Sequence, residues 1–333
     1  MVSFSIIMPV YNVEQFVGRA IQSILNQELV EWELILVNDG SKDNSGIICE
    51  QFAKSDRRIK VIHQQNSGSG IARQNGIDHA TGTHICFIDP DDYLEKSALL
   101  NNKVLIERYT PQVLVNGYNR ILKKNNNEQN IKEVNPEITG CFNKEQFISA
   151  YEKFARNIHK VVWNKVYEKS FLSKYQIKFS NLPVGQDWSF NLDVYSVVEK
   201  ILITDDKYYY YDTTIDSSSV KKYRDNRLEI ELNLIDKQKK MIQMWQKDEE
   251  FSRLISLDFY NAIYVEINNI KNSYNLESIE SKVWTLENSL DKFNLNEKIT
   301  QLKITDFKSY KEKLLFALIK NKNYGIVFRI LMI

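Results

Sequence analysis

The first hundred residues alternate short apolar runs with amphipathic segments, and this alternation limits the possible folds more than any other feature. Four runs rich in β-branched residues predict buried strands, at residues 3–8, 32–37, 59–63 and 83–88. Between them, apolar residues spaced by threes and fours predict helices, at residues 13–25, 47–52 and 71–79. Strands that alternate with helices in this way form a parallel sheet with helices on both faces. We therefore predict an α/β fold.

Polar side chains follow each of the four predicted strands. These clusters are Tyr11-Asn12, Asn38-Asp39, Asn66 to Gly70 and Asp89 to Asp92. The carboxyl ends of parallel strands share one edge of the sheet, where ligands bind, so we expect one site there. A dinucleotide-binding site is not indicated. Arg73 stands where the third glycine after Gly68 and Gly70 belongs, and this segment follows the third strand rather than the first.

The fourth predicted strand ends in CFIDPDD, which places three carboxylates around a proline. Like charges this close repel one another, and each loses hydration at a sheet edge unless a cation is shared. Asp89, Asp91 and Asp92 are therefore candidates for a metal site. The alternative is an Asp-Pro turn followed by a helix N-cap, because aspartate is common in both places.

The rest of the chain predicts a smaller α/β part and a helical extension. The polar tract 123–130 is typical of an exposed hairpin tip or loop, residues 161–172 and 182–196 predict helix, loop and helix, and residues 205–214 predict a tyrosine-rich strand. Beyond about residue 220 the apolar spacing is helical, and glycine is absent from 186 to 324. The predicted domains are residues 1–215, divided into halves 1–105 and 106–215, and a helical extension, residues 216–333.

Composition indicates a cytoplasmic protein without a nucleic-acid partner. Lys and Arg number 44 against 43 Asp and Glu, so the chain has no global basic field. The three cysteines are scattered without metal-ligand spacing, which predicts reduced thiols. No positively charged leader precedes the first apolar run, and no run approaches the ~20 apolar residues of a membrane span.

Two short apolar patches lie near the C-terminus, at residues 314–319 and 326–333, with Lys313 and Arg329 close by. Apolar side chains beside basic ones fit a helix that lies in the anionic inner face of a membrane. The alternatives are that the patches pack on the other helices of the extension or form a homodimer contact.

The motifs together carry a family resemblance. SIIMPVYN, LILVNDGSKDNS, NSGSGIARQNGI and CFIDPDD, in this order, resemble the first half of a family 2 glycosyltransferase of the GT-A fold. VVWNKVYEKSFL and PVGQDWSFNLDVYS are similar to later segments of bacterial glycosyltransferases of polysaccharide, capsule or teichoic-acid synthesis. The resemblance spans about residues 3–215. It implies a nucleotide-sugar donor, usually linked to UDP, a Mn²⁺ or Mg²⁺ ion, and inverting transfer to a hydroxyl of a polysaccharide or lipid-linked oligosaccharide.

The resemblance also implies roles for the residues at the sheet edge. Asp89-Pro90-Asp91 is similar to the DXD motif, in which Asp91 reaches the metal, Asp89 orients the ribose or a metal-bound water, and Asp92 supports either task. Such an ion neutralises the leaving diphosphate. The implied nucleotide contacts are Pro9, Tyr11 stacked on uracil, Asp39 accepting the uracil N–H, Asp89, and Arg73 at the diphosphate. Each also has an alternative without function: Tyr11 as an ordinary aromatic residue at a helix start, Asp39 as a turn residue, and Arg73 as a solvated surface charge.

The same resemblance makes Asp187 the general base that takes the acceptor proton; its alternative is a helix N-cap. Trp163 and Trp188 either flank the sugar or belong to the core. Two departures from the family pattern stand out. Gln186 stands where the family has a glutamate before the base, and Asp212 stands where the family has an arginine. We expect Lys221 or Lys222 to supply the positive charge of that missing arginine. These departures keep open a catalytically weak, sugar-nucleotide-binding protein of the same fold, although retention of Asp89, Asp91 and Asp187 counts against it.

Overall fold

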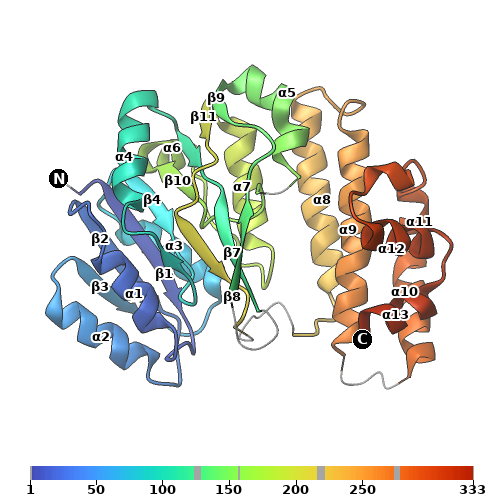
Figure 1. The fold of residues 1–333 in the computed structure, drawn as a ribbon, viewed down its shortest axis with the longest axis horizontal. Helices are drawn as coiled ribbons and strands as arrows, with labels where there is room; N and C mark the ends of the chain where they lie inside the picture. The colour runs from blue at the N-terminus through green and yellow to red at the C-terminus, as the bar shows by residue number, and fades with distance from the viewer. Residues whose placement is uncertain (1, 124–128, 157, 216–221, 274–277, 333) are drawn as a thin grey trace. The chain divides into compact units, whose positions relative to one another are not determined.

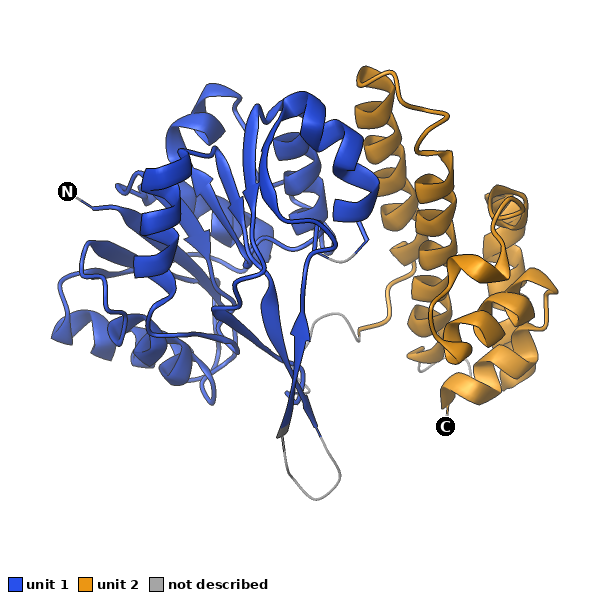
Figure 2. Cartoon of the chain, turned by 45° about the horizontal axis from the view of Figure 1, so that its top comes forward, with its two compact units in different colours: residues 1–217 blue, residues 218–333 orange. Residues whose placement is uncertain are grey.

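The computed structural model describes residues 2–332 apart from 124–128, 157, 216–221 and 274–277 (Figure 1). The chain forms two compact units, Met1–Ser217 and Ser218–Ile333 (Figure 2). The first unit contains the strands and the second is helical.

The first unit is built on a sheet of eight strands among the described residues. Across the sheet these are β3 (Ile59–His63), β2 (Trp32–Asn38), β1 (Phe4–Val10), β4 (His84–Phe87), β10 (Lys165–Glu168), β6 (Val113–Val115), β11 (Lys200–Ile203) and β9 (Gly140–Asn143). The strands β1 to β4 pair in parallel, as predicted. The strand β10 runs antiparallel between β4 and β6, and β9 runs antiparallel to β11, so the second half of the sheet is mixed.

Helices cover both faces of the parallel strands. The helices α1 (Val17–Leu25) and α2 (Ser45–Ser55) pack in one apolar core with Ile6 and Leu34. Alternate strand residues point to opposite faces, and Ile7 meets α3 (Ser69–His79) on the other face. An added Cβ at Gly76 of α3 would lie 2.4 Å from Ile7 Cγ2, so glycine permits this close packing. The predicted α/β fold class is confirmed.

A second sheet of four strands lies in the order β5 (Tyr93–Leu94), β12 (Tyr209–Asp212), β7 (Tyr118–Lys123) and β8 (Gln129–Val134). The strand β12 confirms the predicted tyrosine-rich strand. The strands β7 and β8 are antiparallel neighbours on either side of the polar tract, whose residues 124–128 lie outside the described residues. The remaining helices of this unit are α4 (Ala98–Tyr109), α5 (Lys144–Phe154), α6 (Lys169–Lys174) and α7 (Gln186–Val197).

The helix predicted over 161–172 is wrong in its first part. Residues Lys165–Glu168 form β10, and only α6 is helical. Val166 and Tyr167 are buried between two neighbouring strands, and this tertiary pairing outweighs a short helical pattern. The second predicted helix is confirmed as α7.

The second unit is helical, as predicted. Its α-helices among the described residues are α8 (Arg227–Met244), α9 (Ser252–Lys271), α10 (Ile279–Lys292), α11 (Leu295–Lys298), α12 (Tyr310–Lys320) and α13 (Tyr324–Met332). The two C-terminal apolar patches lie on α12 and α13, where Phe316, Ile319, Val327 and Phe328 are buried. Most of each patch therefore packs within the helical unit. Within the described parts of the chain, no helix has the length and apolar character that a membrane crossing requires.

Candidate active site

Asp39 fixes the start of α3 at the carboxyl edge of the sheet. Its buried carboxylate accepts hydrogen bonds from the backbone N–H groups of Ser67 and Gly68, both at 2.8 Å, and from Gln64 Nε2 at 2.7 Å. Gly68 has a φ of 92°, a conformation that favours glycine, and α3 begins at the next residue. The end of β2 and the start of α3 thus meet where the sequence predicted the nucleotide.

Arg73 joins two other elements at this edge. Its side chain is only 5% exposed. Nη2 donates to Asp89 Oδ1 at 2.6 Å, and Nη1 donates to Asp187 Oδ1 at 2.8 Å. Burial lowers the pKa of Arg73, but the two carboxylates outweigh this effect and raise that pKa above its usual value. The loop after β4 and the start of α7 are therefore held together by a permanent positive charge.

Asp187, the predicted general base, lies in surroundings that raise its pKa. Burial raises its pKa above the usual 3.8, Arg73 opposes this rise, and Asp89 adds to it. A base works best when its pKa approaches the operating pH, and the side chain remains 22% exposed. The N-cap alternative is wrong, because α7 starts at Gln186 and Gly185 is its N-cap, without a side-chain cap.

The start of α3 packs closely on the segment that leads into α7. Gln186 Nε2 donates to Ser69 Oγ at 2.5 Å. A Cβ added to Gly70 would lie 2.9 Å from the Ser180 carbonyl oxygen, so this approach requires glycine. Three buried polar atoms near this junction, Arg73 Nε, Ser180 Oγ and Gln186 Oε1, have no hydrogen-bond partner among the described residues. Buried polar atoms are seldom unpaired, so these three fit a site that receives a polar ligand.

The structure contradicts the supporting role predicted for Asp92. This residue is fully buried; its Oδ2 accepts the Tyr209 hydroxyl at 2.6 Å and its Oδ1 accepts the Asp212 backbone N–H at 2.8 Å. Burial raises the pKa of Asp92, and the Asp89 and Asp91 carboxylates add to the rise. Its carboxyl group therefore anchors the loop to β12 and is not exposed as the carboxylates of a ligand site would be.

The loop retains two partly exposed carboxylates, those of Asp89 and Asp91. Among the described residues, no group of three or more His, Cys, Asp and Glu side chains is placed to hold a metal ion. At phosphate sites Mg²⁺ usually takes one or two carboxylates and completes its shell with substrate phosphates and water. The two carboxylates therefore fit an ion that shares the phosphates of a bound donor.

Comparison with known proteins agrees with this geometry. The family model described as "Glycosyl transferase family 2" matches residues 5–172, just over half of the chain. The chain belongs to glycosyltransferase family 2. The family predicted from the sequence motifs is thereby confirmed.

Two relatives from Bacillus subtilis carry glycosyltransferase names. EpsJ is 35% identical over 62% of this chain and 59% of its own length, and EpsH is 29% identical over 79% of this chain and 75% of its own. The chain thus matches less than two thirds of EpsJ. Among solved structures, Staphylococcus aureus TarS 1–349 in complex with UDP-GlcNAc has a TM-score of 0.60 at 18% identity, covering 98% of this chain and 90% of that one. This likeness supports the family fold.

The two tryptophans predicted beside the sugar are both buried in this family member. Trp163 is 7% exposed and stacks on Tyr209, with ring centroids 4.4 Å apart. Trp188 is 3% exposed, and Lys160 Nζ lies 3.5 Å from its ring centroid. Neither ring presents an open face to a sugar, so the structure contradicts the sugar contact and supports the alternative core role.

Two further predicted nucleotide contacts lie at the end of β1. Pro9 is buried in the strand opposite Val37, whereas Tyr11, just beyond the strand, is 44% exposed. The Tyr11 ring is therefore accessible to a base. Of the two lysines proposed in place of the family arginine, Lys222 is exposed and Lys221 lies outside the described residues.

Lys165 is a site neighbour that sequence reasoning missed. Its buried ammonium donates to the carbonyl oxygens of Ile158 and Val161 at 2.7 and 2.5 Å, and to Asn164 Oδ1 at 2.9 Å. Burial lowers its pKa well below the usual value, while Asp187 opposes this shift. The Trp-Asn-Lys motif was the available signal, but a lysine in an apolar run gives no indication that it is enclosed by carbonyl groups.

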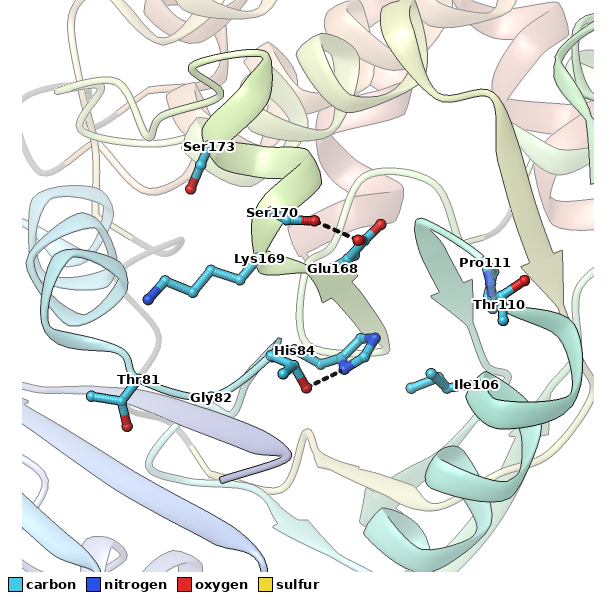
Figure 3. Close-up of a pocket in the computed structure, with 11 residues that line it drawn as sticks. Thr81, Gly82, His84, Ile106, Thr110, Pro111, Glu168, Lys169, Ser170 and Ser173 are labelled. Atoms are coloured by element: carbon cyan, nitrogen blue, oxygen red, sulfur yellow. Dashed lines mark hydrogen bonds between the residues drawn. The ribbon is translucent and has the colours of Figure 1, made fainter. Parts of the chain in front are cut away.

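A separate cavity lies away from these residues, at the opposite edge of the sheet. It has a volume of about 580 Å³ and lies beside His84, the first residue of β4, and Lys169, the first residue of α6 (Figure 3). None of the predicted site residues lines it. His84 faces Thr83 there, Glu168 pairs with Ser170, and the Lys169 ammonium is bonded to the Ala80 carbonyl oxygen.

Proposed function

We propose that this chain is an inverting glycosyltransferase that moves a sugar from a UDP-linked donor to a hydroxyl group of a bacterial polysaccharide or lipid-linked oligosaccharide. The observation that carries this proposal is the Arg73 guanidinium, which contacts both Asp89 of the DXD segment and the candidate base Asp187. In this proposal, the site for the leaving diphosphate and the site for the acceptor hydroxyl would be adjacent. The solved complex of TarS with UDP-GlcNAc supports a UDP-linked donor.

The donor would bind along the carboxyl edge of the sheet. Tyr11 would lie against uracil, and the unused acceptor capacity of Asp39 would meet the uracil N–H. The backbone N–H groups at the start of α3 attract the diphosphate, because a helix N-terminus favours anions. Arg73 stands in the first turns of that helix and adds a full positive charge.

In the proposed chemical step, Asp187 accepts the proton of the acceptor hydroxyl while the oxygen of that hydroxyl forms a bond to the anomeric carbon. The bond from that carbon to the β-phosphate oxygen breaks, and UDP leaves with the electron pair. Attack from the face opposite the leaving group inverts the anomeric centre. Asp91, with Asp89 beside it, would hold Mn²⁺ or Mg²⁺, which neutralises charge that develops on the diphosphate.

The acceptor side of the proposal concerns the membrane. A lipid-linked acceptor at the cytoplasmic leaflet would be reached through a peripheral membrane contact of the C-terminal helices. The alternative is that these helices form a homodimer contact instead. Ile326 and Met332 remain exposed on the same helix as the basic Arg329, Leu314 is exposed on α12, and these side chains support such a contact.

A donor screen tests this function. Purified protein is incubated with a panel of nucleotide sugars in Mn²⁺ or in excess chelator, and free UDP is measured with and without acceptor glycans. We expect one UDP-sugar to be consumed in Mn²⁺ only. Full activity in chelator would contradict the metal-assisted mechanism. Tight UDP binding without turnover of any donor would instead favour the sugar-nucleotide-binding alternative, and no nucleotide binding at all would overturn both.

A further inference from the structure

Arg19, on α1, reaches the loop that carries the DXD segment. Its Nη2 donates to the Asp91 carbonyl oxygen at 2.5 Å, and the same atom lies 3.0 Å from Asp212 Oδ2. The guanidinium also lies over the Tyr93 ring, 5.1 Å from its centroid. One side chain of α1 therefore connects the residue expected to reach the metal with the end of β12.

Asp212 is built into the structure on the other side of this contact. Its side chain is 2% exposed, whereas that of Arg19 is 41% exposed. Its Oδ1 accepts the Thr214 backbone N–H at 3.1 Å and the Thr214 hydroxyl at 2.6 Å, which fixes the carboxylate toward Arg19. The backbone N–H of Asp212 donates to Asp92, so both Asp91 and Asp92 are connected to this residue.

The loop is held from its inner side as well. The Tyr209 hydroxyl accepts the Asp89 backbone N–H at 3.1 Å and donates to Asp92. Tyr209 thus holds the first and last carboxylate residues of the segment. The Asp91 carbonyl oxygen, between them, is bonded to Arg19.

We propose that Arg19 and Asp212 form a clamp that positions Asp91 for the metal and diphosphate, an inference that rests on the function proposed above. Arg19 is a positioning residue: it acts through the Asp91 backbone. Asp212 replaces the arginine of the family pattern, and Arg19 supplies a guanidinium at the same end of β12 from a different element.

An ordinary exposed ion pair would contribute little and would not affect ligand binding. The contact to the Asp91 carbonyl distinguishes this pair, because a shift of the loop backbone moves the attached carboxylate. Loss of a residue that orients a metal ligand commonly weakens metal affinity about 10–100-fold.

The test measures UDP affinity by calorimetry, with Mn²⁺ and with excess chelator. Arg19→Met keeps the aliphatic stem and removes the charge, and Asp212→Asn keeps an acceptor for Thr214 while removing the charge that holds Arg19. Arg19→Lys is the conservative variant. Arg156→Met is the matched control, because Arg156 pairs with Glu137 and Glu152 on the surface of the same unit. Asp91→Asn gives the response to loss of the ligand itself.

We expect Arg19→Met and Asp212→Asn to weaken UDP binding in Mn²⁺ at least ~10-fold and to leave binding in chelator unchanged. Arg19→Lys should recover part of the loss, and Arg156→Met should match the wild type.

If Arg19→Met responds to Mn²⁺ as the wild type does, the clamp is refuted while the proposed function stands. If wild-type UDP affinity is the same in Mn²⁺ and chelator, the metal site fails and the clamp fails with it. Equal losses in both conditions would also overturn the clamp, because they indicate a general effect on the fold.

Discussion

Arg73 and Asp187 are 114 positions apart in the chain, and their side chains meet at 2.8 Å beneath the carboxyl edge of the sheet. This pair connects the start of α3, where an anionic donor would bind, to the start of α7, where the proposed base lies. Arg73 also lowers the pKa that burial raises in Asp187. The same guanidinium therefore holds the base in place and keeps a larger fraction of it ionised.

Replacing the base should separate chemistry from binding. Asp187→Asn keeps the size of the side chain but removes its proton-accepting charge, so turnover should fall at least ~10²-fold. UDP affinity should stay within a few-fold of wild type, because in the proposed function Asp187 would act on the acceptor rather than on UDP. Asp193→Asn, on the same helix, is the matched control. Steady-state kinetics and calorimetry give the two readouts, and lost UDP binding or wild-type turnover would show that Asp187 is misassigned.

The pH profile should respond to Arg73. A base must be ionised to act, so activity falls as the pH drops through the pKa of Asp187. In Arg73→Lys the compact ammonium loses the two-pronged contact with both carboxylates, and its weaker opposition lets burial raise that pKa further. The acid limb of the kcat profile should therefore move to higher pH. Arg156→Lys should leave the limb where it is, and an unmoved limb in Arg73→Lys would contradict the coupling.

Local sequence patterns predicted the first half of the fold, since each parallel strand and its helix carry their own periodicity and turn. For the same reason they predicted that the polar clusters after these strands gather at one edge of the sheet, where we propose the site. The strand β10 escaped prediction because four residues between β4 and β6 depend on distant neighbours for their conformation. The inward turn of Asp92 likewise depends on Tyr209, 117 positions away. Motif spacing places residues on elements but does not fix which side chains face the ligand.

Glu33 should make the first unit sensitive to acid. Burial raises the pKa of this carboxyl, but hydrogen bonds outweigh it and lower that pKa from 4.5 to about 2. The donors include Lys60 Nζ at 2.7 Å, Ser5 Oγ at 2.6 Å and the Thr81 backbone N–H at 2.6 Å. A lowered folded pKa contributes stability above the unfolded value, here about 3 kcal/mol at neutral pH, which is lost as the pH falls from 4.5 toward 2.

Urea unfolding followed across this pH range tests the contribution of Glu33. Glu33→Gln should be less stable than wild type at pH 7, and the difference should shrink as the pH falls. Glu50→Gln is the control, because Glu50 lies near the surface and pairs with the exposed His63. A gap between Glu33→Gln and wild type that stays constant with pH would contradict a charge-based contribution and indicate lost packing instead.

The C-terminal helices should stabilise the second unit through their buried faces. Phe328 of α13 is fully buried, whereas Ile326, two residues earlier on the same helix, is 47% exposed. Phe328→Ala removes a buried ring and leaves a cavity, which commonly costs about 3–5 kcal/mol of folding stability. Ile326→Ala should change stability by less than ~0.5 kcal/mol.

Hydrogen exchange read by mass spectrometry should show faster exchange in peptides of α9, α10 and α12 for Phe328→Ala only, with peptides of β1 to β4 unchanged. Equal exchange in the two variants would show that this face does not stabilise the unit. In a separate flotation assay with anionic liposomes, co-flotation of the wild type that Ile326→Ala loses, with its exchange unchanged, would assign the exposed face to membrane contact.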